Sequence, residues 1–462
     1  MIRSHGQSRR RAAACLAMGA LAMLAASCSS DSSAAPTTTA PATTVPVTTA
    51  PPTTTATSTA GTGGSTTSAA VTTTTPANSD PTTAFATLAP PTGPQIVMGL
   101  VNTEGAPGLD FPDIRIDIQA AVDYLNQHGG LGGRPIKIEN CTAKGSPESS
   151  QSCAQELVGK KVEMVLTGLD LFPAYATYTA AKIPVVGVLP ILPGDYTAKA
   201  LFLTGGNATT MAAVATVARD TFHAKKVGIV SADNPGANGT EASLTASLDK
   251  AGIAHTTVKG GDNETDAGYQ GLMREVTKNN PDLLVSLYSD AGCIGTMRGR
   301  ASLNITTPVI TTGICSAKDV IDAVGDDATG WTFVGVNADQ TTPQQQIMHE
   351  IMAPSLKVSP DKVDSTALGL GALGIFEIMS LAVYGDMMQT AGKKVDGPSL
   401  YSYLETSKDL TLWPGGAPIA CGSAAKYPSV CSFNFPFAEY QKGGKVVPVK
   451  GLESVSSKEL LP

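Results

Sequence analysis

A glycine-rich run, QHGGLGG at 127–133, is the first place where the residue types could do chemistry. Glycine-rich loops hold phosphates when their backbone N–H groups lie between a strand and the helix that follows it. Here Gly129, Gly130, Gly132 and Gly133 lie on the other side, between a helical pattern and the strand-like PIKIE. We therefore predict a corner, with Gly129 or Gly130 ending the helix in the left-handed region, and no ligand.

Sequence patterns of the common catalytic sites are missing from the chain. It has no G-x-S-x-G, no H-E-x-x-H and no G-x-x-x-x-G-K-[ST]. The histidines beyond the first 27 residues have no serine or cysteine nearby in sequence that would suit nucleophilic catalysis; they are His128, His223, His255 and His349. We predict that the protein is not an enzyme and that it needs no cofactor.

Six of the eight cysteines fall in three pairs that are close in sequence. Although six cysteines allow 15 connectivities, local pairing is the simplest, and it predicts the disulfides Cys141–Cys153, Cys293–Cys315 and Cys421–Cys431. A metal site is a weaker alternative, because no C-x-x-C spacing occurs and no histidine adjoins any of the six. Disulfides persist outside the cytoplasm, so the pairing indicates an exported protein.

The first 27 residues have the pattern of an export signal. Four arginines precede a short apolar core at 12–26, which is too short to span a bilayer comfortably. The core ends in LAASC, which resembles a lipobox, with Cys28 as the lipidated residue. The match departs from the usual pattern, because Leu24 lies four residues before Cys28 and not three; an ordinary cleaved signal is the alternative. We predict an anchor to the outer face of the cell membrane through a lipid on Cys28.

Residues 28–93 form a Thr/Ala/Pro-rich linker with almost no charge. Such a segment cannot bury a core, so we predict a disordered stalk, stiffened by proline, that lifts a domain off the membrane. Removing the first 27 residues takes away four basic residues, and the formal charge falls from −7 to −11, with 28 basic and 39 acidic residues. This balance argues against a nucleic-acid partner.

Beyond residue 93 strand-like and helix-like runs alternate, which indicates parallel strands joined by crossover helices. The predicted strands lie at 96–101, 135–139, 162–168, 184–189, 226–232, 254–259, 282–288, 308–313 and 331–337. The predicted helices lie at 112–128, 148–159, 174–181, 208–223, 239–251, 268–279, 292–302, 343–353, 366–391 and 397–406. A terminal hairpin is predicted at 433–449, turning at Gly443-Gly444. This length exceeds one comfortable core, so two α/β lobes are expected.

Three stretches, MGLV…DIQAAVDYLNQHGGLGGRPIKIENC…SCAQELV, AKKVGIVSADNPGANG and the terminal hairpin, carry a family resemblance. The chain resembles the solute-binding proteins of ABC importers, in the branched-chain amino-acid-binding group, from about Gln95 to Val449. The resemblance implies a type I periplasmic binding fold: two doubly wound lobes, three crossovers and a ligand in a central cleft. Lobe 1 would take 94–206 and 338–415, and lobe 2 would take 207–337 and 416–462.

The resemblance also implies a function. The protein would capture a small organic solute by lobe closure and deliver it, as a monomer, to ABC permease subunits in the membrane. The alternative is a ligand-sensing receptor that signals through a membrane or surface partner.

Ligands of such folds lie beyond the carboxyl ends of parallel strands, so the loops after the predicted strands hold the site candidates. These are Thr103, Phe111, Leu169, Asp170, Leu189, Pro190, Asn234, Tyr288 and Asp290. Several have ordinary structural alternatives. Leu169 and Leu189 could be core residues, Asp170 and Asp290 could cap helices, and Phe111 could pack inside the lobe.

The candidate loops depart from the family's amino-acid binders, which hold the α-carboxylate with hydroxyls of two lobe 1 loops. Here those loops read Gly168-Leu169-Asp170 and Leu-Pro-Ile from Leu189, and the lobe 2 acid expected by resemblance falls on Gly292, with Asp290 nearby. A carboxylate beside Asp170 would be repelled. We therefore predict that the solute is amino-acid-like or less charged, amide-like or apolar.

Overall fold

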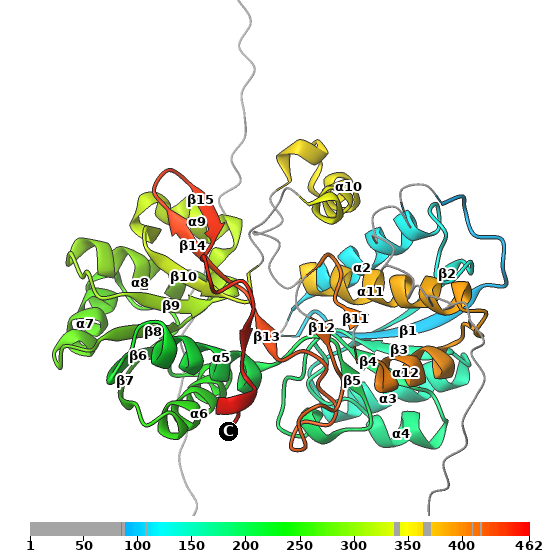
Figure 1. Cartoon of the computed structure of the whole chain (residues 1–462), viewed down its shortest axis with the longest axis horizontal. Helices are drawn as coiled ribbons and strands as arrows, with labels where there is room; N and C mark the ends of the chain where they lie inside the picture. Colours follow the sequence, from blue (N-terminus) through cyan, green and yellow to red (C-terminus); the bar gives the residue numbers. More distant parts are fainter. Residues whose placement is uncertain are drawn as a thin grey trace, which may run out of the picture. The chain divides into compact units, whose positions relative to one another are not determined.

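The computed structural model describes residues 85, 88–106, 110–336, 342–363, 371–408, 410–415 and 418–462. The predicted signal peptide, the predicted lipidation site at Cys28 and nearly all of the predicted linker lie outside the described residues. The described part belongs to one compact unit, and it contains the two sheets expected for two lobes (Figure 1).

The first sheet holds the strands of the amino-terminal half, all parallel, in the order β2-β1-β3-β4-β5. Their bounds are Ile96–Thr103 for β1, Ile136–Ala143 for β2, Met164–Thr167 for β3, Val185–Gly187 for β4 and Leu201–Phe202 for β5. Strand β1 pairs with both β2 and β3 and is buried nearly throughout, because both faces of the sheet are covered. Alternate residues therefore enter different cores, as Leu100 and Val101 do.

Helices cover this sheet on both faces (Figure 1). On one side lie α2 (Pro112–Leu125), α11 (Gly371–Thr390) and α12 (Gly397–Thr406), and on the other lie α3 (Pro147–Gly159) and α4 (Tyr175–Ala180). Proline begins α2 and α3, a position where its missing N–H costs nothing. Helix α10 (Pro343–Leu356) packs against α2. The first lobe thus recruits helices from the carboxyl-terminal half of the chain.

The second sheet has the order β15-β14-β10-β9-β8-β6-β7. Its strands are β6 (Lys226–Ala232), β7 (Ala254–Gly260), β8 (Leu283–Leu287), β9 (Val309–Thr312), β10 (Trp331–Val334), β14 (Phe437–Gln441) and β15 (Lys445–Pro448). The first five run parallel, and β14 joins β10 antiparallel. The turn between β14 and β15 contains Gly443 and Gly444, both at positive φ, so the predicted hairpin is confirmed.

The second lobe is also a three-layer structure. Its helices are α5 (Asn207–Asp220), α6 (Pro235–Lys250), α7 (Asp266–Thr277), α8 (Asp290–Ser302) and α9 (Lys318–Val324). In β8, Leu283 and Val285 face the core shared with α5 and α6, whereas Leu284 faces the core shared with α7 and α8. This alternation follows the two-residue period of a strand. The two sheets with helices on both faces confirm the predicted α/β class.

Segments that lead from one lobe to the other run side by side. The short strand β5 ends the first sheet, and its residue Phe202 receives a hydrogen bond from Cys431 N (2.9 Å) and donates one from its own N to Ser429 O (2.7 Å). The carboxyl-terminal part of the chain also contains short strands, namely β11 (Leu410–Thr411), β12 (Pro418–Ile419), β13 (Asn434–Phe435) and β16 (Val455–Ser456). The lobe boundaries given above stay predictions; residues 337–341 lie outside the described part.

Helix α11 is long and apolar enough, by length and composition, to cross a membrane. About 72% of its apolar window is buried within the protein, and its residues form much of the core against α2. It is therefore a core helix of lobe 1, apolar around most of its circumference because most of it is covered.

The glycine-rich run is a corner, as predicted. Gly129, Gly130, Gly132 and Gly133 all have positive φ, and Gly130 N closes the end of α2 by donating to Leu125 O at 2.8 Å. A side chain at Gly132 would place its Cβ 2.8 Å from the carbonyl oxygen of Gly385, so only glycine allows the turn to rest on α11.

Candidate functional site

The amide of Asn102 joins the loops after β1 and β3. Its Oδ1 accepts a hydrogen bond from Leu169 N (3.0 Å), and its Nδ2 donates to Phe111 O (2.7 Å). In addition, Thr103 N donates to Leu169 O at 3.0 Å, and Phe111 N donates to Thr103 O at 3.1 Å. These bonds bring three of the predicted site residues, Thr103, Phe111 and Leu169, together at the carboxyl edge of the first sheet.

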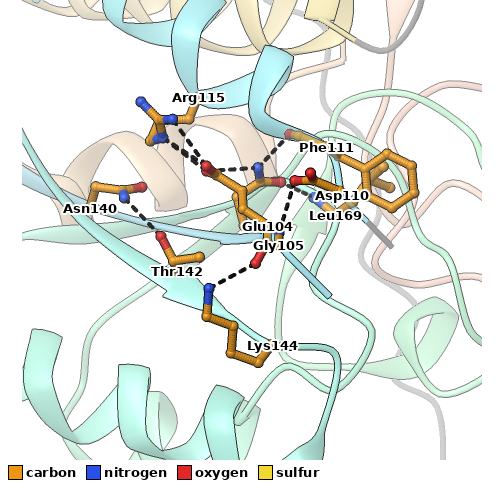
Figure 2. A network of polar contacts seen from close by, with 10 residues as sticks. Glu104, Gly105, Asp110, Phe111, Arg115, Asn140, Thr142, Lys144 and Leu169 are labelled. Carbon is orange, nitrogen blue, oxygen red and sulfur yellow. Dashed lines mark hydrogen bonds and ion pairs between the residues drawn. The ribbon is translucent and has the colours of Figure 1, made fainter. Parts of the chain in front are cut away.

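Charged side chains of neighbouring elements also bind the loop after β1 (Figure 2). Arg115 on α2 grips the Glu104 carboxylate with Nε 2.9 Å from Oε1 and Nη2 3.0 Å from Oε2. Lys144 Nζ donates to Glu104 O (3.0 Å), and Gly105 N donates to the Asp110 carboxylate (2.8 Å). The bidentate arrangement fixes direction as well as distance, so the Glu104 side chain is held in place by the protein itself.

The three residues of this loop pair differ in what they expose. Thr103 is completely buried, and its Oγ1 has no hydrogen-bond partner among the described residues. Leu169 is 8% exposed and belongs to the lobe 1 core, and Phe111 packs partly buried against that core. A buried hydroxyl without a partner is unusual, and the Thr103 hydroxyl is a polar group of this loop that no described residue satisfies.

Asp170 points into lobe 1. Its Oδ1 accepts from Ser150 Oγ (2.6 Å) and from Phe172 N (3.1 Å), and it is 3% exposed. Burial raises its pKa above the usual value, while the hydrogen bonds from Ser150 and Phe172 oppose that rise. Asp195, also buried, similarly accepts from Ile191 N and from Tyr175 Oη, each at 2.8 Å. These two carboxyls thus shape the loops after β3 and β4.

Leu189 and Pro190 follow β4, and Pro190 lies beside Gly206, in the segment between β5 and α5. The Pro190 carbonyl lies so near Gly206 that a Cβ there would be 2.1 Å from it. Leu189 is half-buried and lines a cavity described below.

In lobe 2 the predicted residues follow β6 and β8, which pair directly. Asn234 caps α6, its Oδ1 accepting from Ala237 N (2.8 Å), and its Nδ2 donates to the Asp262 carboxylate (2.6 Å). Tyr288 is buried, edge-on to Tyr269 with ring centroids 5.7 Å apart. Asp290 is exposed in the first turn of α8 at φ +43°, while Ser289 is the N-cap.

All three predicted disulfides are present in the structure: Cys141–Cys153, Cys293–Cys315 and Cys421–Cys431. The second joins the start of α8 to the turn after β9, and both of its cysteines are fully buried. The third closes the excursion between β12 and β13 beside the segment that passes between the lobes. Among the described residues no group of three or more His, Cys, Asp or Glu is placed to hold a metal ion.

A cavity of about 590 Å³ lies where the segments between the lobes meet. Those segments contribute residues 204–205, 334–336, 412–415, 432 and 434–437, and α11 contributes Leu373 and Phe376. The size falls in the range of about 300–1,000 Å³ that is usual for small-molecule sites. Of the residues predicted from sequence, Leu189 lines it.

The other residues that line this cavity were not predicted from the sequence. Phe376 lies on a core helix, Trp413 lies between β11 and β12, and Phe435 lies in the two-residue strand β13. The sequence around two of these residues has a recognisable local pattern. Trp413 lies in LTLWPGG, and Phe435 lies in the aromatic run FNFPF. Each of these two aromatics directly precedes a proline, Pro414 or Pro436, and this is the local feature that they share.

A family model described as "Periplasmic binding protein" matches residues 95–429. The chain belongs to this family. The match covers the first sheet, the parallel strands of the second sheet and the chain as far as residue 429, so the resemblance seen in the sequence and the type I periplasmic binding fold are confirmed. The protein is therefore a solute-binding protein by family, and its relatives are binding proteins, in agreement with the prediction that it is not an enzyme.

One curated relative is the Leu/Ile/Val-binding protein BraC3 of Rhizobium johnstonii, 23% identical over 344 residues, which are 71% of this chain and 87% of the relative. Solved structures share the fold at lower identity. LivJ of Streptococcus pneumoniae, solved with isoleucine, has 17% identity and a TM-score of 0.57 and covers 78% of this chain and 99% of its own. A solute-binding protein of R. palustris, solved with benzoate, has 16% identity and a TM-score of 0.56 and covers 79% and 97%.

Proposed function

We propose that this chain is an extracytoplasmic solute-binding protein that captures a small organic solute between its lobes and delivers it to an ABC importer. The observation that carries the proposal is the cavity at the segments joining two α/β lobes, in a chain of the periplasmic binding protein family. Hinged lobes can close over a ligand and exclude water, which gives the importer a loaded form to recognise.

The proposed solute site joins the cavity to the loops at the carboxyl ends of the strands. In lobe 1 it includes the loops of Thr103, Phe111, Leu169, Asp170, Leu189 and Pro190, and in lobe 2 those of Asn234, Tyr288 and Asp290. In lobe 1, Asn102 and Arg115 hold described residues of the loops after β1 and β3, namely Glu104, Phe111 and Leu169. A site built in advance in this way loses little entropy when the solute binds.

The ligands of similar proteins and the residues of these loops together suggest a class of solute. The relatives are named for leucine, isoleucine and valine or were solved with isoleucine or benzoate. We propose a solute of comparable size that is amino-acid-like or less charged, amide-like or apolar. We also propose that the protein is anchored outside the cell by a lipid on Cys28, with residues 28–93 as a stalk, and that it acts as a monomer.

A thermal-shift screen of the full chain tests the binding proposal. Branched-chain amino acids, their amides and aromatic acids and amides would be added one at a time, and calorimetry would measure the affinity of each hit. A ligand at 100 times its Kd raises the free energy of unfolding by about 2.7 kcal/mol. The proposal predicts at least one stabilising solute; no stabilisation by any of them would contradict it.

Delivery is tested separately, with the cognate permease reconstituted in lipid vesicles. Solute uptake that requires this protein and ATP supports transport. Solute binding without any uptake would favour the alternative, a ligand-sensing receptor that signals through a membrane or surface partner.

A further inference from the structure

The cavity at the joining segments has an aromatic wall. Phe376 of α11, Trp413, Phe435 of β13 and Phe437 of β14 all line it, and Leu189 and Leu373 add aliphatic surface. Its volume of about 590 Å³ is far larger than the roughly 30 Å³ of one water molecule. Aromatic faces prefer offset-stacked or edge-to-face contact with another ring, in addition to the burial of apolar area.

Charge is scarce in the same lining. Among the described residues that line the cavity, Glu453 is the charged one, and none is Lys, Arg or His. Glu453 is exposed at the rim, and hydrogen bonds from its own backbone N–H and that of Gly451 lower its pKa, so it is ionised at neutral pH. A carboxylate in the cavity would lose its water without gaining a cation and would face this negative charge.

Uncharged polar side chains of the lining are free to bind a ligand, and Asn434 and Thr210 are among them. Asn434 on β13 and Thr210 on α5 both line the cavity, and neither side chain is hydrogen-bonded within the described residues. In contrast, the Thr204 hydroxyl already donates to Val188 O. An amide and a hydroxyl can both donate and accept, so together they suit a neutral carbonyl, amide or hydroxyl group.

We propose that this cavity binds an aromatic, uncharged or cationic portion of the solute and excludes an anionic one. The ring would lie against Phe376, Trp413 and Phe435, and a neutral polar group would pair with Asn434 or Thr210. This inference rests on the proposed function, since it assumes that a solute enters between the lobes. It differs from what the relatives' isoleucine and benzoate suggest, because both of those ligands carry a carboxylate.

Trp413 supplies a direct readout. The chain has two tryptophans, and the other, Trp331, is buried in the lobe 2 core and does not line the cavity. In the full chain carrying Trp331→Phe, the remaining indole fluorescence comes from Trp413, which lines the cavity and is 1% exposed. The probes are three molecules with one ring and chain but different charge: 3-phenylpropanamide, 3-phenylpropylamine and 3-phenylpropanoate.

The expected result is a saturable fluorescence change with the amide or the amine and a Kd at least tenfold weaker for the carboxylate. Binding of the carboxylate with equal or higher affinity would overturn the proposal. If Trp331→Phe does not fold, calorimetry of the unmodified chain with the same three probes gives the same comparison of affinities.

A filling substitution locates the binding. Leu373→Trp would occupy the cavity and should weaken amide binding at least tenfold, followed by calorimetry. Ile116→Trp, on the exposed side of α2 in the same lobe, is the matched control and should leave the affinity within twofold. Equal affinity in the two variants would overturn the proposal.

The outcomes separate this inference from the proposed function. A solute screen that finds a tight anionic ligand, unaffected by Leu373→Trp, supports solute binding and contradicts the inference. A screen without any stabilising solute contradicts both.

Discussion

The backbone N–H of Trp413 donates a hydrogen bond of 2.9 Å to Oγ of Ser380, 33 residues earlier on α11. One turn further along the helix, Tyr384 Oη donates to Thr411 O at 2.8 Å. These two bonds hold residues 411–413, from the end of β11 into the connection that follows, against a core helix. The aromatic wall of the cavity therefore depends on hydrogen bonds from α11 as well as on packing.

Ser380→Ala should destabilise the protein and disturb the cavity. The substitution leaves the buried N–H of Trp413 without a partner, which costs about 1–3 kcal/mol in the free energy of unfolding. Urea denaturation measures the loss. Ser302→Ala, whose exposed hydroxyl bonds within α8, is the control and should change stability by less than about 0.5 kcal/mol. Equal effects would show that the bond to Trp413 is unimportant.

Arg115→Gln should loosen the loop after β1. Glu104 keeps only 12% of its side chain exposed, so it loses a bidentate partner in a poorly hydrated place. We expect a loss of about 1–2 kcal/mol, smaller at high salt because Arg115 itself is 36% exposed. Lys278→Ala, which breaks an exposed ion pair with Glu275, should cost almost nothing. Unchanged stability and unchanged solute affinity in Arg115→Gln would contradict a positioning role.

Removing the Cys293–Cys315 disulfide should destabilise lobe 2. The bond closes a loop over a sequence separation of 22 residues, and such crosslinks contribute about 2–4 kcal/mol, mostly by restricting the unfolded chain. The double variant Cys293→Ser and Cys315→Ser tests this in guanidinium denaturation. The matched control removes Cys141–Cys153 in lobe 1. If solute binding depends on a rigid lobe 2 rim, only the first variant should weaken it; equal weakening by both would contradict that role.

Glu377 should make stability depend on pH in an unusual direction. Both carboxyl oxygens are buried on α11 and have no hydrogen-bond partner among the described residues, and burial raises the pKa of Glu377 well above its usual value of 4.5. When pH rises above 4.5 the unfolded chain releases this proton while the folded protein still holds it. The group's contribution to stability is therefore lost progressively as pH rises towards the folded-state pKa.

Glu377→Leu should remove that dependence. Relative to the parent protein, the variant should gain stability as pH rises from about 4 to 7, measured by denaturation at several pH values. Glu405→Gln, at an exposed pair with Lys199, is the control and should follow the parent curve closely. A constant difference between Glu377→Leu and the parent across this range would refute the mechanism.

Local patterns in the sequence were enough for most of the secondary structure. Strand β6 matches its predicted range of 226–232, and α12 begins and ends as expected. Buried apolar runs and helical spacing are short-range patterns, so they can be recognised in the sequence without knowledge of the fold. The turns at 129–133 and 443–444 were also predicted, because their glycines can adopt the positive φ that such turns require. The short elements β5, β11, β12 and α9 were missed, because two to seven residues carry too little periodicity.

Site prediction from strand ends was partial for a physical reason. A strand pattern indicates where a loop begins, but it does not indicate which way each side chain turns. Tyr288 follows β8 as predicted, yet its ring packs against Tyr269 inside the lobe. Asp170 follows β3, and its carboxyl turns to Ser150 on α3.

By itself, the sequence determined the α/β class, the three disulfide pairs and the family, because each depends on residue type and spacing along the chain. Only the tertiary structure decided where an apolar cavity opens. Phe376, Trp413 and Phe435 come from a core helix and two short connections, and nothing in their local sequence says that they meet. Such a surface forms only when distant segments pack together. The free energy of hydrophobic burial depends on the apolar area buried and not on the separation of the residues along the chain.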